Sequence, residues 1–198
     1  MIFWIAILYH VASRLAYVGW VGAALSAQHR RQLAAPGENF ESRYEGFRRR
    51  ASQLMTNDAI SLVLLCLVTR QTLHIATPQW LLWLVSTALI VAGVGIKMWA
   101  AKTLGSKAYY WHNFFVTAPE APAEATGPYR YISNPMYTVG YLQVYGLALA
   151  FGSLPALLGG LFDQLAILVF HLRVERPHYH ALMEPNHRSA EPEHLKAP

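Results

Sequence analysis

Residues 136–172 read MYTVGYLQVYGLALAFGSLPALLGGLFDQLAILVFHL. Two apolar runs, 136–152 and 154–172, are separated here only by Ser153, and Pro155 follows closely. A membrane-spanning helix needs about 20 predominantly apolar residues. The two runs therefore predict two antiparallel membrane helices that are joined by a tight turn, which together form a helical hairpin.

Three more apolar runs, 2–27, 54–76 and 80–101, precede this hairpin. Of the 198 residues, 54% are hydrophobic and 14% are charged, whereas soluble domains carry about 25% charged residues. We therefore predict an all-α integral membrane protein with about five transmembrane helices, the last two forming the hairpin.

The chain divides into three parts by composition. We expect a three-helix membrane region over 1–101, with a basic cytoplasmic loop near 28–53. Residues 102–183 then contain a polar connector and the hairpin, and we expect the catalytic groups there. The connector includes the Pro- and Ala-rich stretch 118–126, APEAPAEAT, whose composition is typical of a loop. Residues 184–198 are predicted to be a mobile tail.

The basic residues indicate an orientation. All of the 16 Lys and Arg residues except Arg14 and Arg70 follow the first run, the fifth run, or the end of the third. Short cytoplasmic loops carry the excess of Lys and Arg. We therefore predict an external N-terminus, a cytoplasmic C-terminus and an active site that faces the cytoplasm. Because no charged n-region or cleavage site precedes Arg14, we expect a retained anchor that starts near Met1.

Charge and cysteine usage exclude several classes of protein. The net charge is +5 and the pI is near 9.4, but the basic residues cluster at helix ends, as expected beside an anionic leaflet and not for a nucleic-acid surface. The single cysteine, Cys66, lies in the second run, which excludes an internal disulfide and a cysteine metal cluster.

Nine histidines are present, yet their spacing matches no metal motif. His178 and His180 are two residues apart, and no HExxH sequence occurs. We expect no metal. His10 and Arg14 share a face of the first helix, and polar side chains inside a membrane usually face the helix bundle.

Residues 127–140, GPYRYISNPMYTVG, join the connector to the hairpin. Asn134 precedes a proline and is biased toward extended or turn geometry, whereas Pro135 suits the first turn of a helix. Arg130, Asn134 and Tyr137 then supply polar groups around exposed backbone N–H groups. Alternatively, the segment holds only a snorkelling arginine and interfacial tyrosines.

Glu175 lies at the cytoplasmic end of the fifth run, between Arg173 and Arg176. Pro177 should end or kink the helix there. Because the last two helices form a hairpin, we expect Glu175 and Tyr137 on the same membrane face. The alternative is a solvated charge pair at a helix end, which contributes about 0 to 1 kcal/mol.

Gly93, Val94 and Gly95 lie within the third run, near Lys97. Small residues in a membrane helix usually permit close helix packing. They could equally let a bulky ligand approach the backbone. The segment does not follow a strand, so it is not a Rossmann fingerprint.

These residues resemble a family of membrane methyltransferases, the superfamily of phosphatidylethanolamine N-methyltransferase and isoprenylcysteine carboxyl methyltransferase. The resemblance covers residues 93–183 and depends on Arg130, Asn134, Pro135, Tyr137 and Glu175. NPMY and the Glu-x-Pro ending are forms of the phospholipid methyltransferase branch. The carboxyl methyltransferases instead favour a Glu-Glu pair, whose second position is Arg176 here.

The resemblance implies S-adenosylmethionine as the cofactor. Its sulfonium is a cation that aromatic faces bind, and Trp111 is an additional aromatic candidate. The residues that the resemblance implies for cofactor binding are Gly93, Val94, Gly95, Tyr129, Tyr131, Asn134, Pro135, Tyr137, Glu175 and Arg176. Glu175 would accept hydrogen bonds from the ribose or the methionyl ammonium, and Arg130 would pair with a carboxylate or phosphate.

Methyl transfer is an in-line displacement, so the enzyme must align nucleophile and methyl carbon. A lipid amine must also lose a proton, and Glu175, His112 and His171 are candidate general bases. The sequence distinguishes none of them. Arg130 completes the expected catalytic set.

The methyl acceptor implied first is the amine of phosphatidylethanolamine or of its methylated forms. An isoprenylcysteine carboxylate or a small thiol is the alternative, so the partner is a lipid or a prenylated small molecule that enters from the bilayer. Two other classes remain open. One is an NADPH-dependent membrane reductase of the steroid-reductase type, with Arg130, Arg173 and Arg176 binding the cofactor's phosphates. The other is a non-catalytic membrane scaffold.

Overall fold

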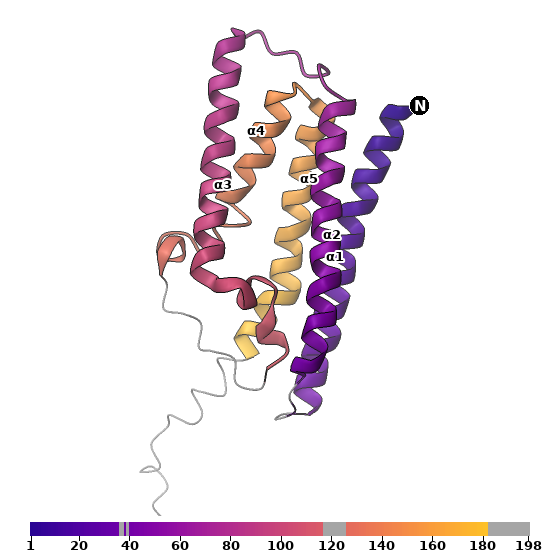
Figure 1. Cartoon of the computed structure of the whole chain (residues 1–198), viewed down its shortest axis with the longest axis vertical. Helices are drawn as coiled ribbons and strands as arrows, with labels where there is room; N and C mark the ends of the chain where they lie inside the picture. The colour runs from indigo at the N-terminus through magenta and orange to yellow at the C-terminus, as the bar shows by residue number, and fades with distance from the viewer. Residues whose placement is uncertain (36–37, 39, 117–125, 182–198) are drawn as a thin grey trace, which may run out of the picture.

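The computed structural model describes residues 1–35, 38, 40–116 and 126–181, and every regular element in those residues is helical (Figure 1). The principal helices are α1 (Ile2–Ala34), α2 (Glu41–Val68), α3 (Gln79–Tyr109), α4 (Leu142–Ala150) and α5 (Leu154–Phe170). They run alternately down and up the molecule, with the N-terminus at one end and residue 181 at the other. The expected mobile tail, 184–198, and nearly all of the stretch 118–126 lie outside the described residues.

The described helices have the length and composition of an integral membrane protein. Four of them are long and apolar enough to cross a bilayer, namely Ile2–Ala34, Glu41–Val68, Gln79–Phe114 and Leu154–Ala181. Large apolar side chains such as Leu84, Val91, Leu158 and Leu165 are exposed on their outer surfaces. An apolar exterior of this kind suits lipid contact.

Residues 136–152, expected to form the fourth membrane helix, are only partly α-helical. Helix α4 has nine residues and follows a short 3₁₀ turn, Val139–Tyr141. Before that turn the backbone is irregular, and Gln164 of α5 donates from Nε2 to the carbonyl of Tyr137 over 3.1 Å. Pro135 has no N–H to donate to a helical ladder. Irregular backbone at membrane depth is tolerated only where protein buries it or where it lines a cavity.

The basic loop expected over 28–53 is mostly helix. Helix α1 continues to Ala34 and α2 begins at Glu41, so only 35–40 connects them. Arg, Glu, Gln and Ala favour helices in water, and an apolar pattern marks only the membrane part of each helix. Helix α2 also ends at Val68 and not at residue 76. Gln71 there has a φ of 61°, and its N–H donates to the carbonyl of Phe151 over 3.1 Å.

Of the two outcomes expected at Pro177, an end or a kink, the helix does not end there but is distorted ahead of the proline. After Phe170 the chain makes a π-helical turn, η4 (His171–Glu175), and then continues as a helix to residue 181. The helix is distorted before the proline, where the missing N–H of Pro177 would otherwise leave a carbonyl unpaired. The wider turn places Glu175 in the interior, where it is buried.

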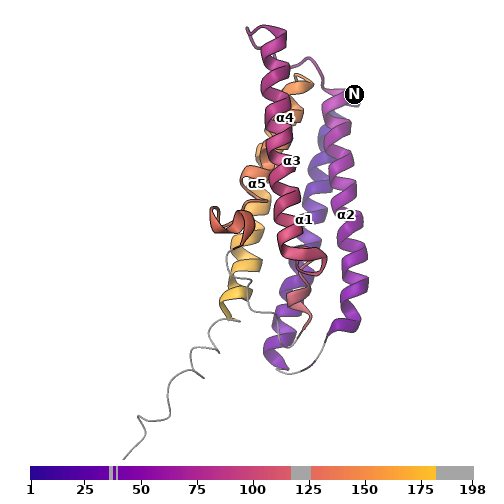
Figure 2. The ribbon, with the colours of Figure 1, turned by 60° about the vertical axis from the view of Figure 1, so that its left-hand side comes forward.

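Two glycines bring α3 and α4 together. A Cβ at Gly93 would collide with the backbone nitrogen of Gln143 and lie 3.0 Å from its Cα, and one at Gly146 would lie 2.7 Å from the carbonyl oxygen of Ser86. Helix α3 therefore packs closely on α4, while α2 packs on α1 and α5. Helices α2 and α3 make little direct contact along their described lengths, and Figure 2 shows α2 standing beside α1, apart from α4.

Candidate functional site

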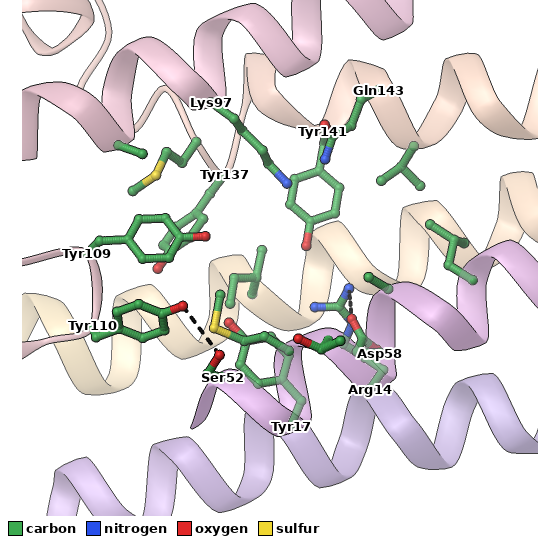
Figure 3. A pocket seen from close by; sticks show the side chains of 18 of the residues that line it. Arg14, Tyr17, Ser52, Asp58, Lys97, Tyr109, Tyr110, Tyr137, Tyr141 and Gln143 are labelled. Carbon is green, nitrogen blue, oxygen red and sulfur yellow. Dashed lines mark hydrogen bonds and ion pairs between the residues drawn. The ribbon is translucent and has the colours of Figure 1, made fainter. Parts of the chain in front are cut away.

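A cavity of about 570 Å³ lies among α1, α2, α3, the start of α4 and α5. This volume is in the range of small-molecule sites. Figure 3 shows many of its lining side chains. The polar and aromatic ones include Arg14, Tyr17, Asp58, Lys97, Tyr109, Tyr110, Trp111, Tyr137 and Tyr141. Tyr109 and Tyr110 lie toward one end of the view, whereas Arg14 and Asp58 lie toward the other.

Trp111 and Tyr137 form an aromatic wall of this cavity, and Glu175 lies directly behind them. Its Oε1 accepts hydrogen bonds from the Trp111 indole N–H and from the Tyr137 hydroxyl, the second over 2.8 Å. Its Oε2 is 2.6 Å from His171 Nδ1. The predicted proximity of Glu175 and Tyr137 is therefore present, and the carboxylate fixes two side chains that line the cavity.

The position of Trp111 depends on two unusual backbone conformations. Helix α3 is interrupted at Gly105, whose φ is 77°, a value that glycine adopts without steric cost. Trp111 itself has left-handed geometry with a φ of 56°. The chain thereby turns back across the end of α3 and directs the indole toward Glu175. Trp111 is buried, and its ring meets that of Phe170 edge to face at 5.6 Å.

Tyr129 belongs to the 3₁₀ turn η2 (Gly127–Arg130). Its hydroxyl is buried and has no hydrogen-bond partner among the residues that the structure describes. Burial raises the pKa of Tyr129 above its usual value, and the nearby Glu175 carboxylate raises it further. Tyr129 is thus a neutral hydroxyl near Glu175 with free hydrogen-bonding capacity.

A second polar cluster joins three helices. Arg14 of α1 donates from Nη2 to Asp58 of α2 and from Nε to Asp163 of α5, each over 2.7 Å. His10 Nδ1 lies 2.9 Å from Ser61 Oγ, and its Nε2 lies 3.4 Å from Asp163 Oδ2. These charges are buried, as expected for ionisable side chains inside a membrane protein that face the bundle and pair with one another.

The same cluster bears on the expectation of no metal. His10, Asp58 and Asp163 bring potential ligand atoms within 4.8 Å of one another, although they are far apart in the sequence. Arg14 is hydrogen-bonded to both carboxylates. Its positive charge already balances one of theirs, and its bonds take one oxygen of each. The cluster is thus an ion-pair network around Arg14, and the expectation of no metal stays a prediction.

Four residues expected in the site lie away from the cavity. Arg130 and Tyr131 are exposed at the surface, and Arg176 is exposed and donates from Nε to His180 over 3.3 Å. His112 faces the start of α2, with Nε2 3.6 Å from Glu41 Oε1. These side chains would have to reach the cavity from outside it.

Gly93, Val94 and Gly95 also lie apart from the cavity wall. Gly93 contacts the backbone of Gln143, as described above. Val94 is exposed, and nothing lies within 4 Å of a Cβ built at Gly95. Gly93 therefore serves close helix packing, whereas Val94 and Gly95 face away from α4, and the role of the segment in cofactor binding stays a prediction.

Asn134 and Pro135 shape the segment that leads into α4. Asn134 accepts a hydrogen bond from the Tyr137 N–H through Oδ1 over 3.3 Å, and the Pro135 carbonyl accepts one from the Gly140 N–H over 2.8 Å. Asn134 thus holds the backbone of Tyr137, while Pro135 supports the turn that follows it. Neither side chain lines the cavity.

Sequence reasoning missed Tyr17, Asp58 and Tyr141 as cavity residues. For Asp58 the sequence contained a usable signal, because a carboxylate within an apolar helix needs a partner. Arg14, noted on the same face as His10, was the available cation. What the sequence could not supply was the register between α1, α2 and α5.

Comparison with known proteins adds a separate line of observation. A sequence model of the phospholipid methyltransferase family matches residues 81–184. A curated phosphatidylethanolamine N-methyltransferase of Debaryomyces hansenii is 29% identical over 143 residues, which are 69% of this chain and 16% of that relative. One from Schizosaccharomyces pombe is 35% identical over 91 residues, 46% of this chain and 10% of that relative.

The chain therefore spans only a small part of the length of these relatives. A third relative, from Pyricularia oryzae, repeats this pattern, with 28% identity over 70% of this chain and 14% of the relative. No solved structure matches the chain.

Proposed function

Because the chain belongs to the phospholipid methyltransferase family, we propose that it transfers a methyl group from S-adenosylmethionine to the amine of phosphatidylethanolamine or its methylated forms. Its curated relatives carry the name phosphatidylethanolamine N-methyltransferase. The observation that carries the proposal is the buried Glu175 carboxylate bound to Trp111 and Tyr137, which both line a cavity of suitable size. All three residues lie in the matched segment.

The residues around Glu175 suit the cofactor. S-adenosylmethionine carries its methyl carbon on a positively charged sulfur. In the transfer, the lone pair of the amine forms the new C–N bond, and the electron pair of the broken C–S bond stays on sulfur. Trp111, Tyr137 and Tyr110 offer aromatic faces to a cation at this end of the cavity, a contact that contributes about 0.5 to 2 kcal/mol for each ring. Tyr129 adds a buried hydroxyl with free hydrogen-bonding capacity.

Glu175 is better suited to holding this wall than to accepting the substrate's proton. Both of its oxygens already have hydrogen-bond partners in Trp111, Tyr137 and His171 and so are engaged in positioning these side chains. Of the two histidine candidates, His171 is beside the cluster, with its ring 5.9 Å from that of Tyr137. His112 contacts Tyr44 instead. Neither histidine lines the cavity, so we propose that His171 holds Glu175 in place and does not take the amine's proton directly.

We further propose five membrane passes, with the N-terminus outside and the C-terminus in the cytoplasm. Residues 131–150 make the fourth pass, whose first part is irregular. The end of the molecule where α1 meets α2 carries Arg31 and Arg48, and residues of η4 lie near the same end (Figure 1). Since basic residues mark the cytoplasmic side, the Glu175 end of the cavity would face the cytosolic cofactor.

The lipid acceptor would reach the cavity from the bilayer, between α2 and α3. These two helices make little contact, and the cavity is lined between them by Met55, Ala59 and Leu62 of α2 and by Met98 of α3. At the proposed cytoplasmic end the gap is bridged, since the Tyr44 hydroxyl donates to the Lys107 carbonyl over 3.2 Å. Apolar lining and a closed polar end suit a substrate with acyl chains.

The alternatives have less support. Arg130, Arg173 and Arg176, which an NADPH reductase would use for phosphates, are all exposed and do not line the cavity. A prenylated carboxylate or a thiol acceptor shares the same cofactor end, so only the acceptor can separate those enzymes from a phospholipid methyltransferase.

The test is methyl transfer by the purified protein in lipid nanodiscs. We expect radiolabelled methyl groups from S-adenosylmethionine to appear in phosphatidylethanolamine, but not in a prenylcysteine or a small thiol offered at equal concentration. Thermal denaturation should shift upward with S-adenosylhomocysteine and not with NADPH. Stabilisation by NADPH alone would overturn the methyltransferase proposal, and label in prenylcysteine alone would change its acceptor.

A further inference from the structure

We propose that Asp58 and Lys97 bind the headgroup of the phospholipid acceptor, Asp58 taking its ammonium group and Lys97 its phosphate. This inference rests on the proposed function and specifies the acceptor half of the same cavity. Asp58 precedes the segment that matches the family, which begins at residue 81. The assignment therefore comes from the geometry of this chain.

Asp58 is a buried carboxylate with unused hydrogen-bonding capacity. Its side chain lines the cavity, and Arg14 Nη2 binds its Oδ2 over 2.7 Å. Its Oδ1 has no hydrogen-bond partner among the described residues. A buried charge without full compensation is costly. An ethanolamine ammonium group offers up to three N–H donors and a positive charge, which is the chemistry that this carboxylate lacks.

Lys97 is a cation on the opposite wall of the same cavity. Its Nζ lies 5.1 Å from the centroid of the Tyr141 ring, which Figure 3 shows beside it. Within the described part of the chain it makes no ion pair with a carboxylate, whereas Lys107 on the same helix lies 3.9 Å from Glu41. A lysine ammonium that faces a cavity is a point charge suited to a phosphate.

The balance of charge around Asp58 and Lys97 favours a zwitterionic ligand. Arg14 and Lys97 are positive, while Asp58 and Asp163 are negative, so the four groups have no formal net charge. An anionic headgroup such as phosphatidylglycerol could pair with Lys97 but would offer no cationic donor to Asp58 Oδ1. Phosphatidylethanolamine supplies one charge of each sign.

The two residues also come from the two helices between which the lipid would enter. Asp58 is on α2 and Lys97 is on α3, and the apolar residues named above lie on the same helices. A headgroup held between them would leave its acyl chains in the gap. Glu175 and the aromatic wall would then be free for the cofactor.

Short-chain lipids test the proposal by direct binding to the purified, detergent-solubilised full chain. Dihexanoyl phosphatidylethanolamine should bind the wild type at least tenfold more tightly than the phosphatidylglycerol or phosphatidylcholine analogues. Phosphatidylglycerol lacks the ammonium group, and the ammonium group of phosphatidylcholine has no N–H to donate. Asp58→Asn should abolish the preference over phosphatidylglycerol. Lys97→Met should weaken binding of the ethanolamine and glycerol lipids alike, about tenfold, and Lys97→Arg should restore it.

Asp163→Asn is the matched control. It removes the other carboxylate that binds Arg14, yet Asp163 does not line the cavity, so the headgroup preference should persist. An unchanged ratio of ethanolamine to glycerol lipid binding in Asp58→Asn would overturn the proposal. If that variant fails to fold, equal binding of the three lipids by the wild type would overturn it without any substitution.

Methyl transfer by the wild type separates this inference from the proposed function. If phosphatidylethanolamine is methylated and the KM for that lipid is unchanged in Asp58→Asn and Lys97→Met, the headgroup site is wrong and the proposed function stands. If the wild type binds the ethanolamine lipid through these residues but transfers no methyl group, the headgroup site stands and the proposed function is wrong.

Discussion

Tyr137 and Glu175 are 38 residues apart in the chain, and the tyrosine hydroxyl donates to the glutamate Oε1 over 2.8 Å. The bond joins the irregular segment before α4 to the π turn after α5. It therefore couples the backbone geometry of two distorted segments to the shape of one cavity wall. The residues on either side of this bond give the first two predictions.

Tyr137→Phe should weaken cofactor binding while the fold is retained. The ring stays, but Glu175 loses one donor out of three, and a hydrogen bond to a charged group contributes about 1.5 to 3 kcal/mol. We expect the Kd for S-adenosylhomocysteine to rise about tenfold or more, measured by calorimetry. Tyr131→Phe is the control, because Tyr131 lies in the same segment and is 74% exposed. Equal effects of the two substitutions would remove Tyr137 from the site.

Glu175→Gln should abolish detectable cofactor binding. The amide removes the negative charge and replaces one acceptor oxygen with an NH₂ group, so Trp111, Tyr137 and His171 would be left with one neutral acceptor in place of a carboxylate. Membrane insertion should be unaffected, as judged by extraction and size-exclusion behaviour. Glu45→Gln serves as the control, since Glu45 is exposed and pairs only with Arg48 at the surface. Normal cofactor affinity in Glu175→Gln would place the cofactor elsewhere.

Gly93→Ala and Gly95→Ala should differ sharply. A Cβ at Gly93 meets the backbone of Gln143, while one at Gly95 meets nothing within 4 Å. Overpacking costs about 1 to 3 kcal/mol, whereas alanine in an open helical position favours the helix. The melting temperature should fall only for Gly93→Ala. Loss of cofactor binding in a stable Gly95→Ala protein would restore the glycine segment as a cofactor contact.

Arg14→Met should destabilise the protein severely. It leaves Asp58 and Asp163 buried beside each other without their shared cation, and breaking a buried ion pair costs about 3 to 5 kcal/mol. Arg48→Met removes only an exposed pair with Glu45, which contributes about 0 to 1 kcal/mol. Thermal melts of both variants in the same detergent measure the difference. A mild effect of Arg14→Met would mean that the carboxylates are held in another way.

The proposed orientation can be checked with single cysteines. Cys66 is buried, so Cys66→Ala provides a background without reactive thiols. Glu45→Cys should then react with an impermeant maleimide only from the cytoplasmic side of vesicles, and His74→Cys only from the outside. Both positions are exposed. The reverse pattern would invert the topology and with it the side from which the cofactor arrives.

Apolar patterning predicted the membrane parts of α1, α3 and α5 well, because a bilayer imposes length and composition on a helix. The apolar pattern did not predict the polar ends of the helices, such as the part of α2 that begins at Glu41. Polar residues form helices there without any apolar pattern. The hairpin was enough to predict that Tyr137 and Glu175 meet. The Arg14, Asp58 and Asp163 network depends on the register of three helices, which no local pattern records.

Glycine spacing does not show which glycine packs against a neighbour, for a similar reason. Gly93 and Gly95 look equivalent in the sequence, but helix rotation places one against α4 and the other on the open surface. Arg130 and Arg176 carried the expected charge in the expected segments, yet both side chains point to the surface. Which way a side chain points at a helix end depends on the local turn, here η2 and η4.

Helix α4 has nine residues and rises only about 14 Å, roughly half of a hydrocarbon core. The rest of its pass has carbonyl groups that a single side chain, Gln164, satisfies at Tyr137 and Thr138. A side chain of α5 therefore replaces, at these two carbonyls, the backbone donors that a continuous helix would provide. Loss of the Gln164 amide would leave both carbonyls without this donor, so Gln164 acts as a splint for the segment that leads into α4.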